Sequence, residues 1–245
     1  MIKLITIITK FIVATLIALL FSSCVYSSLG MGIKGSGNVT TDTRPANQEF
    51  KSIEVSSGIR VIVSQSDNKS ITVQADDNLQ QHIITKIENG VLIIESDKGY
   101  NATETPVVNV KIPVINGLST SSGSEITSSG VLITENIDVK SESGSEINIE
   151  VEADAIKIES ESGSSIEVGG KALKLETSSS SGSQIDAKKL MTNEVKANSE
   201  SGSSTSVYPI VRLDAKASSG SSINYHKSPK TILKVEYSGG SVHPE

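Results

Sequence analysis

Ser143-Gly-Ser-Glu-Ile147, Ser162-Gly-Ser-Ser-Ile166 and Ser181-Gly-Ser-Gln-Ile185 are copies of one phrase, Ser-Gly-Ser-x-Ile, which recurs from Ser122 to the C-terminus. The glycines of the copies, with a degenerate last one at Gly239, are separated by 21, 19, 19, 20, 18 and 19 residues. Such a fixed spacing is typical of a repeat protein. The repeat glycines are Gly123, Gly144, Gly163, Gly182, Gly202 and Gly220.

Apolar and small residues recur at fixed distances from each glycine, and these distances share one parity. Aliphatic residues dominate the positions seven before and three after the glycine, and serines stand three before, one before and one after it. The intervening residues, such as Lys140 and Glu142, are mostly charged or polar. A period of two indicates β-strands with one buried and one solvent-exposed face. The aliphatic columns are Ile137, Ile156, Leu175, Val195 and Leu213, and Ile147, Ile166, Ile185 and Ile223.

A repeat of about 19 residues fits one coil of a parallel β-solenoid. It is too short for two helices or for a propeller blade of about 40 to 45 residues. Short strands in each coil would stack on the next coil about 4.8 Å away, so that equivalent residues lie one above the other. The predicted fold is therefore all-β, a parallel β-helix whose coils are right-handed by the general preference of parallel connections.

The glycines and serines of the phrase predict the corner of each coil. Each glycine named above is a predicted structural turn, because glycine adopts positive φ and lets the next coil approach closely. The serine columns are predicted to lie inside, where a hydroxyl both donates and accepts hydrogen bonds along the axis and so offsets the cost of burial. If the corner interrupts the alternation, part of the serine set faces solvent instead.

Charges alternate in sign six residues before the glycines. In a parallel stack, opposite charges on adjacent coils attract weakly, whereas like charges repel. The alternation therefore supports the stacked arrangement. The column reads Asp138, Lys157, Glu176, Lys196 and Asp214.

Residues 1–23 have the features of a secretory signal peptide. Lys3 and Lys10 both precede an apolar run over residues 11–21, and the small residues Ser22 and Ser23 follow it. Cys24, the only cysteine, comes directly after Ser22-Ser23 and resembles the lipidated residue of bacterial lipoproteins. A lipidated Cys24 would tether the chain to a membrane without spanning it; the alternative is a free thiol.

The rest of the chain divides into three predicted parts. Residues 24–47 are rich in Ser, Gly and Thr and are predicted to be a flexible tether. Residues 48–118 are a β-rich region with an Asn89-Gly90 hairpin turn, which caps or begins the solenoid. Residues 119–245 are the Ser-Gly-Ser solenoid. Its last copy shifts parity, with the apolar residues Leu233, Val235 and Tyr237 out of phase, so that the last coil is expected to be an edge or cap.

Four stretches in this order resemble the family of putative auto-transporter adhesins, head GIN domain, of Bacteroidetes-type bacteria. The resemblance covers about residues 35–237 and implies a β-helical fold, a cell-envelope location and a role in adhesion. It carries no catalytic residues. The stretches are Gly35-Ser-Gly-Asn-Val39, Phe50-Lys-Ser-Ile-Glu-Val55 leading into Gly58-Ile-Arg-Val-Ile-Val63, Asn89-Gly-Val-Leu-Ile-Ile94, and the Ser-Gly-Ser repeats.

The sequence offers little for catalysis or for cofactors. His82, His226 and His243 are scattered without metal-ligand spacing, and no phosphate loop or nucleophile elbow is present. We therefore expect no catalytic residues, no cofactor and no metal. The net charge of −6 disfavours nucleic acid as a partner.

A polysaccharide-active β-helix is the enzyme alternative, because two rows of carboxylates could supply an acid and a base. Stacked carboxylates are more often a solvated face, and Trp, a common sugar platform, is absent. The rows are Glu125 with Glu146, and Glu142, Glu161 and Glu200.

The predicted function is that of a noncatalytic lipoprotein of the bacterial outer membrane, anchored through Cys24, whose solenoid surface serves adhesion or binding. Two alternatives stay open: a periplasmic scaffold that contacts other envelope proteins, and a protein that binds or degrades polysaccharide. The expected partners are the membrane, through the lipid anchor, and an envelope protein or a glycan. The protein would lie on the periplasmic side or on the cell surface.

Overall fold

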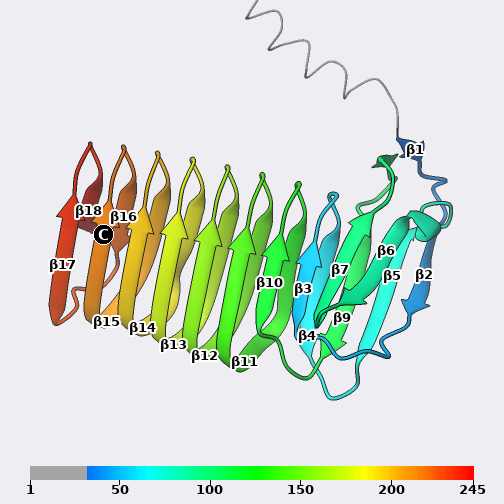
Figure 1. Ribbon diagram of the computed structural model, residues 1–245, viewed down its shortest axis with the longest axis horizontal. Coiled ribbons are helices and arrows are strands. Elements are labelled where there is room, and N and C mark those ends of the chain that lie inside the picture. Colours follow the sequence, from blue (N-terminus) through cyan, green and yellow to red (C-terminus); the bar gives the residue numbers. More distant parts are fainter. Residues whose placement is uncertain (1–31) are drawn as a thin grey trace, which may run out of the picture.

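The computed structural model describes residues 32–245, which form one long column of stacked strands (Figure 1). Neighbouring strands of the repeat region pair in parallel, so the predicted parallel solenoid is confirmed. These strands are β10 (Gly117–Thr120), β11 (Glu125–Ser141), β12 (Glu146–Ser160), β13 (Ser165–Ser179), β14 (Gln184–Ser199), β15 (Ser204–Ala217), β16 (Ser222–Tyr225), β17 (Thr231–Glu236) and β18 (Ser241–Pro244).

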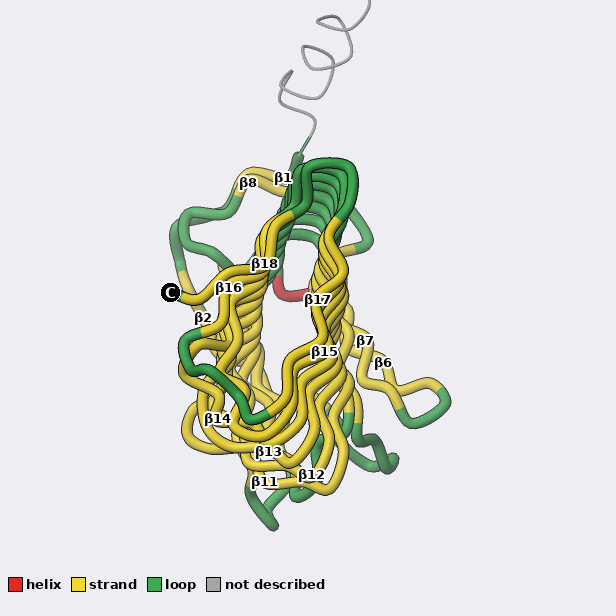
Figure 2. Tube along the Cα trace, turned by 90° about the vertical axis from the view of Figure 1, so that its left-hand side faces the viewer, coloured by secondary structure: helices red, strands yellow, loops and turns green. Residues whose placement is uncertain are grey.

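Each coil is a flattened loop with two sheet faces (Figure 2). We call face A the sheet that precedes each Ser-Gly turn, formed by β10, β17 and the C-terminal halves of β11 to β15. Face B is the sheet that follows the turn, formed by β16, β18 and the N-terminal halves of β11 to β15. The Ser-Gly turns stack along one edge, the turn edge. The long strands bend from face B to face A along the other edge, the corner edge.

Equivalent aliphatic residues stack in single file. Ile147 pairs with Ile166, and Ile166 pairs with Ile185, in adjacent strands of face B. All three side chains are fully buried. Because aromatic residues make up only 3% of the chain, the core between the faces is mainly aliphatic.

Coils of unequal length are accommodated near the corner edge. Register shifts lie between Thr127 and Val131 in β11, between Glu167 and Gly169 in the β13–β14 pair, and between Ala187 and Met191 in the β14–β15 pair. Extra residues bulge there and leave the pairing on both faces in register. The spacings of 18 to 21 residues are therefore compatible with one continuous stack.

The turns place two consecutive residues in the left-handed region. Ser143 has φ of 54° and Gly144 has φ of 69°, and the other repeat turns are alike. Positive φ at both central positions is what a type I′ turn requires. The expected close approach of the next coil is wrong, because a Cβ built on Gly144 would meet no atom within 4 Å. Glycine is needed there for its backbone angle alone.

The serines after the glycine tie each coil to the one before it. Ser183 Oγ accepts a hydrogen bond from the Ser180 N–H at 3.1 Å and donates one to the Ser160 carbonyl at 2.6 Å. The same pair of bonds recurs at the equivalent serines of neighbouring coils: Ser164, Ser203 and Ser221. Burial of these hydroxyls is thus compensated along the axis, as the sequence predicts.

The other two serine columns differ in exposure. The serines three before the glycine are buried and bond to neighbouring hydroxyls, as Ser179 Oγ does with Ser199 Oγ at 2.9 Å. The serines one before the glycine, such as Ser143, are exposed at the tip of the turn. The turn therefore interrupts the alternation, and this column faces solvent.

The N-terminal region contains a further coil inside the stack. Strands β3 (Ser52–Val55) and β4 (Arg60–Gln65) flank a turn at Ser57-Gly58 with φ of 68° and 70°. β3 lies between β7 (Val91–Ser96) and β10, and β4 lies between β9 (Val107–Ile112) and β11. The β3–β4 coil therefore lies in space between strands that come after it in the sequence: β7 and β9 on one side, and β10 and β11 on the other. The order of the coils in the column thus differs from their order in the chain.

Antiparallel strands close the N-terminal end of the column. On one face β6 (Ile83–Glu88) pairs with β7 through the predicted Asn89-Gly90 hairpin, and on the other β2 (Val39–Arg44) and β5 (Ser70–Asp76) continue from β9. Two short strands, β1 (Ile33–Lys34) and β8 (Tyr100–Asn101), and the 3-10 helix η1 (Gln80–His82) complete this end. Residues 33–34 and 39–44 are thus strands, which corrects the prediction that all of residues 24–47 is a flexible tether.

A buried carboxylate latches the Gly35–Asn38 loop onto the cap. Asp76 has no exposed surface, and its oxygens accept hydrogen bonds from the Gly37 N–H at 2.8 Å and the Thr103 N–H at 2.9 Å. A Cβ on Gly35 would lie 2.2 Å from Asp76 Oδ2. Asp77 receives further bonds from the Ser36 and Asn38 side chains. The Gly-Ser-Gly-Asn stretch is therefore a structural device that holds the cap together.

We expect two buried hydroxyls to respond in opposite ways to removal. Ser183→Ala would leave the Ser180 N–H and the Ser160 carbonyl without this partner and lower the free energy of unfolding by about 1–3 kcal/mol. Thr177 Oγ1 is buried and has no hydrogen-bond partner, so Thr177→Val would raise stability. Denaturant unfolding of the two variants measures both effects. A stability loss in both would contradict this account of the serine columns.

The hydrogen bonds from Gly37 and Thr103 to Asp76 are expected to weaken in acid. The N–H groups of Thr103 and Gly37 hold the pKa of Asp76 below its usual value against the opposing effect of burial. A lowered folded-state pKa stabilises the cap above the unfolded pKa, and this contribution is lost as pH falls through the folded value. An NMR titration from about pH 6 to pH 2 should shift the Gly37 and Thr103 amide resonances at a lower pH than amides beside ordinary exposed carboxylates of the repeats. Asp76→Asn, the control, should abolish that late step.

Candidate functional site

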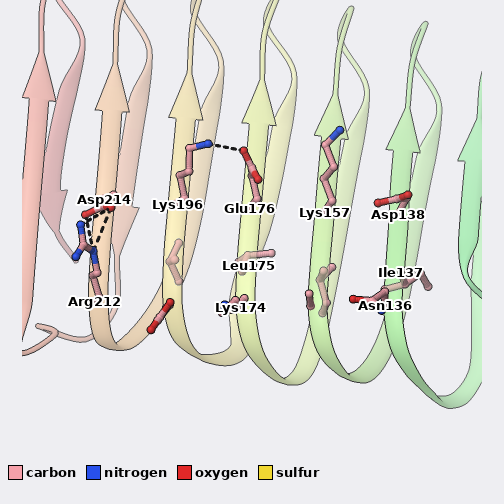
Figure 3. Close-up of a pocket in the computed structure, with 14 residues that line it drawn as sticks. Asn136, Ile137, Asp138, Lys157, Lys174, Leu175, Glu176, Lys196, Arg212 and Asp214 are labelled. Carbon is pink, nitrogen blue, oxygen red and sulfur yellow. Dashed lines mark hydrogen bonds and ion pairs between the residues drawn. The ribbon is translucent and has the colours of Figure 1, made fainter.

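A groove runs across the outer side of face A, perpendicular to the strands (Figure 3). Its volume is about 530 Å³, and residues of β11, β12, β13, β14 and β15 line it. Figure 2 shows that the coil widens toward the corner edge, so this wall of the solenoid is bent rather than flat. The groove therefore presents the same face of successive coils to one extended ligand.

Small side chains open one end of the groove. Asn136 and Ala155 occupy the outward positions that Lys174, Glu194 and Arg212 occupy in later coils. The shorter side chains leave the backbone of β11 and β12 less covered. An approaching ligand therefore has the freest access over these two coils.

The groove carries balanced charge. Its lining includes four cations and four carboxylates, so their formal charges cancel. A surface of this kind lacks the net positive charge that a polyanion requires. It suits a partner that carries both signs of charge or none. The lining charges are Lys157, Lys174, Lys196 and Arg212, and Asp138, Glu176, Glu194 and Asp214.

The predicted alternation of charge produces one contact between coils. Lys196 Nζ lies 2.7 Å from Glu176 Oε1 on the adjacent strand. Lys157 instead pairs with Glu159 of its own strand, at 2.7 Å. Arg212 and Asp214 likewise pair within β15 at 2.8 Å (Figure 3). A long cation can reach the residue two positions away on the same face, and this contact competes with the neighbouring coil.

The contacts within a strand favour the charged forms of Lys157 and Arg212. The hydrogen bond from Lys157 to Glu159, with the charge of that carboxylate, raises the pKa of Lys157 above its usual value. Asp214 raises the pKa of Arg212 in the same way. The charged forms of these two side chains are therefore favoured.

The predicted carboxylate rows lie outside the groove. Glu125 is the direct neighbour of Glu146 on face B, and Glu125 Oε2 pairs with Arg60 Nε at 2.7 Å. Glu142 and Glu161 lie in the turns of adjacent coils, and Glu142 pairs with Lys140 at 2.6 Å. Ser180 stands between Glu161 and Glu200, so the second row is interrupted.

The three histidines do not form one cluster. His82 lies beside Asp97 near the cap, whereas His226, beside Glu245, and His243, on β18, both lie at the other end of the column. Within residues 32–245, no group of three or more His, Cys, Asp or Glu side chains is placed to hold a metal ion.

A second groove lies along the corner edge, and sequence reasoning missed it. It has a volume of about 500 Å³ and includes the exposed apolar residues Ile133, Leu173 and Met191. These residues fall between the aligned columns, where coil lengths vary. The only feature of the sequence that marks them is that they are apolar although the alternation within the coil predicts an exposed position.

The six predicted turn glycines all lie at the turn edge, with φ from 69° to 72°. Cys24 and the predicted signal peptide, residues 1–23, lie outside the described residues. In the part of the chain that the structure describes, no helix has the length and apolar character needed to cross a bilayer.

The fold and the groove define a class of protein, an all-β solenoid with a charge-balanced groove on one face. The model of one family, putative auto-transporter adhesin, head GIN domain, matches residues 49–229. The chain belongs to this family. No curated protein matches the sequence.

Solved structures of similar fold come from Bacteroides and Parabacteroides species. A putative adhesin from Bacteroides fragilis has 20% identity and a TM-score of 0.81, and the match covers 87% of this chain and 100% of that one. A putative adhesin from Parabacteroides merdae has 17% identity and a TM-score of 0.69, with 88% and 100% covered. A protein described as a putative lipid binding protein from Parabacteroides distasonis has 20% identity and a TM-score of 0.70, with 87% and 99% covered. These similarities establish the fold.

Proposed function

We propose that the protein is a noncatalytic binding module of the bacterial envelope, and that it holds an extended partner in the groove of face A. The groove is the observation that carries this proposal, since it spans β11 to β15. Membership of an adhesin family supports a role in attachment. Three of the four cations of the groove, Lys157, Lys196 and Arg212, are paired with carboxylates, which favours recognition over acid–base chemistry.

An extended polypeptide fits the groove better than a glycan does. Its lining contains no aromatic side chain, although sugar sites commonly use aromatic platforms. Alternating charges along the groove match a polypeptide that carries both signs. The partner we propose is therefore a protein segment on a cell surface or in the envelope, and a glycan is the competing outcome.

We also propose that the chain is exported and anchored through Cys24. The signal-peptide pattern of residues 1–23 and the position of Cys24 directly after Ser22-Ser23 support the anchor. A lipid at Cys24 would leave the solenoid outside the bilayer as a rigid body. The protein would then lie at the outer membrane.

A large side chain introduced into the groove should weaken binding of the partner. Ala155→Trp would place a large side chain in the groove over β12, and binding is expected to weaken about tenfold or more, a change of about 1.4 kcal/mol or more. Binding is measured against a panel of envelope proteins, extracellular matrix proteins and glycans. Asn148→Trp, which adds the same side chain at an exposed position of face B on the same strand, is the matched control.

The outcome separates the alternatives. Loss of protein binding in Ala155→Trp but not in Asn148→Trp supports the proposal. Equal effects in both variants, or no binder in the panel, would contradict it. A glycan lost in Ala155→Trp would instead support the polysaccharide-binding alternative.

The anchor is tested with Cys24→Ser. Metabolic labelling with a fatty-acid analogue should mark the wild-type chain and leave the variant unlabelled, and the variant should leave the membrane fraction. Protease treatment of intact cells then separates the cell surface from the periplasmic side. Labelling that persists in Cys24→Ser would reject lipidation at this residue.

A further inference from the structure

The last strand of face A carries an apolar outer row. β17 lies at the end of the column (Figure 1), and its outward side chains Leu233, Val235 and Tyr237 are 55%, 45% and 44% exposed. In the coil before it, the positions paired with Leu233 and Val235 are Asp214 and Lys216. Because the alternation is shifted by one residue, β17 has apolar side chains on its outer surface at the positions where β15 has charged ones.

On the inner side of β17, the polar side chains of Lys234 and Glu236 form hydrogen bonds across the end of the column. Lys234 Nζ donates to the Val242 carbonyl at 2.9 Å and to the Tyr225 hydroxyl at 3.1 Å. Glu236 Oε1 accepts a hydrogen bond from the Val242 N–H at 2.5 Å. A further parallel coil with an uncharged interior, like β15 with Ala215 and Ala217 at these positions, would bury both charges without opposite charges beside them, which is costly. Continuation of the solenoid in the same direction is therefore disfavoured.

One edge of β17 has no strand partner among the described residues. The Tyr237 N–H donates to the Ala217 carbonyl, so odd-numbered residues of this strand bond toward β15. Backbone groups alternate sides along a strand, so those of Ile232, Lys234 and Glu236 point away from the column. This edge can accept another strand.

A second copy of β17 matches this edge in one antiparallel register. With a two-fold axis at Val235, Lys234 of each copy lies opposite Glu236 of the other, and both pairs join opposite charges. Leu233 lies opposite Tyr237, so the outer rows of the two copies merge into one apolar cluster. A register with the axis at Lys234 would place that cation opposite itself and is disfavoured.

We propose that two copies of the chain pair through β17 in this antiparallel register. The contact is isologous and closes on itself, so that it gives a dimer and not a filament. Face A of one copy continues into face A of the other. The proposal rests on the end of the column and is independent of the ligand of the groove.

Disulfide trapping tests the register directly. Val235 would lie opposite its own copy in a non-hydrogen-bonded pair, where Cα atoms are about 4.5 Å apart, within the range a disulfide bridges. Val235→Cys in the full chain, oxidised in intact cells with copper phenanthroline, should shift most of the protein to a band of twice the mass. Joining the two thiols releases two protons to the solvent and two electrons, which the copper complex accepts and passes to dissolved oxygen.

Two matched variants and the wild-type chain serve as controls. Leu233→Cys lies in the same row but opposite Tyr237, and Ile133→Cys lies at the corner edge, where Ile133 is more exposed (65%) than Val235 (45%). On a denaturing gel both should run at the mass of a single, uncrosslinked chain, as should the wild type, whose only cysteine is Cys24. A chain with Val235→Lys, which removes the apolar contact, should elute at half the mass of the wild type in light scattering.

The proposal is overturned if Val235→Cys gives no dimer, or if Leu233→Cys and Ile133→Cys give as much. It is also overturned if Val235→Cys links to a different protein, since that result assigns the edge to another partner. Efficient dimer in Val235→Cys alone, with loss of the dimer in Val235→Lys, supports it.

Discussion

Parallel pairing in register is the constraint on which the structure depends. Because each strand bonds to the equivalent strand of the next coil, an interior residue lies directly against its own counterpart, as Ile166 does between Ile147 and Ile185. Aliphatic side chains tolerate such stacking. Serine tolerates it too, because a hydroxyl is both donor and acceptor. Like charges do not, so the interior columns are built from few residue types.

The sequence predicts the repeat region well because the signal is periodic. Parity within a coil and spacing between coils identify the buried columns, and the hydroxyl bonds along the axis follow from burial of serine. The turn glycines are more instructive. Positive φ is found at Gly144, but close packing is not, since a Cβ there would meet nothing. Composition alone does not distinguish these two reasons for glycine.

The cap could not be predicted in the same way, because its contacts join segments far apart without a repeat. Asp76 and Gly37 are distant in sequence, and neither the Asp-Asp-Asn turn nor the Gly-Ser-Gly-Asn stretch indicates the other. The position of the β3–β4 coil between β9 and β11 also breaks the order of the chain. The groove was missed because it depends on the bend of face A and on the small size of Ala155, neither of which the columns describe.

Departures from the repeat are where specific contacts become possible. A position that recurs unchanged offers the same surface in every coil, and so it cannot mark one place on the column. Ala155 opens the groove only over two coils, the extra residues near the corner edge expose Leu173 and Met191, and the parity shift turns Val235 outward. The regular columns supply rigidity, and the irregular residues on that rigid frame give each end and each edge a different chemistry. A binding surface on a solenoid is therefore best sought where the stacking rule is broken without loss of the hydrogen-bonded ladder.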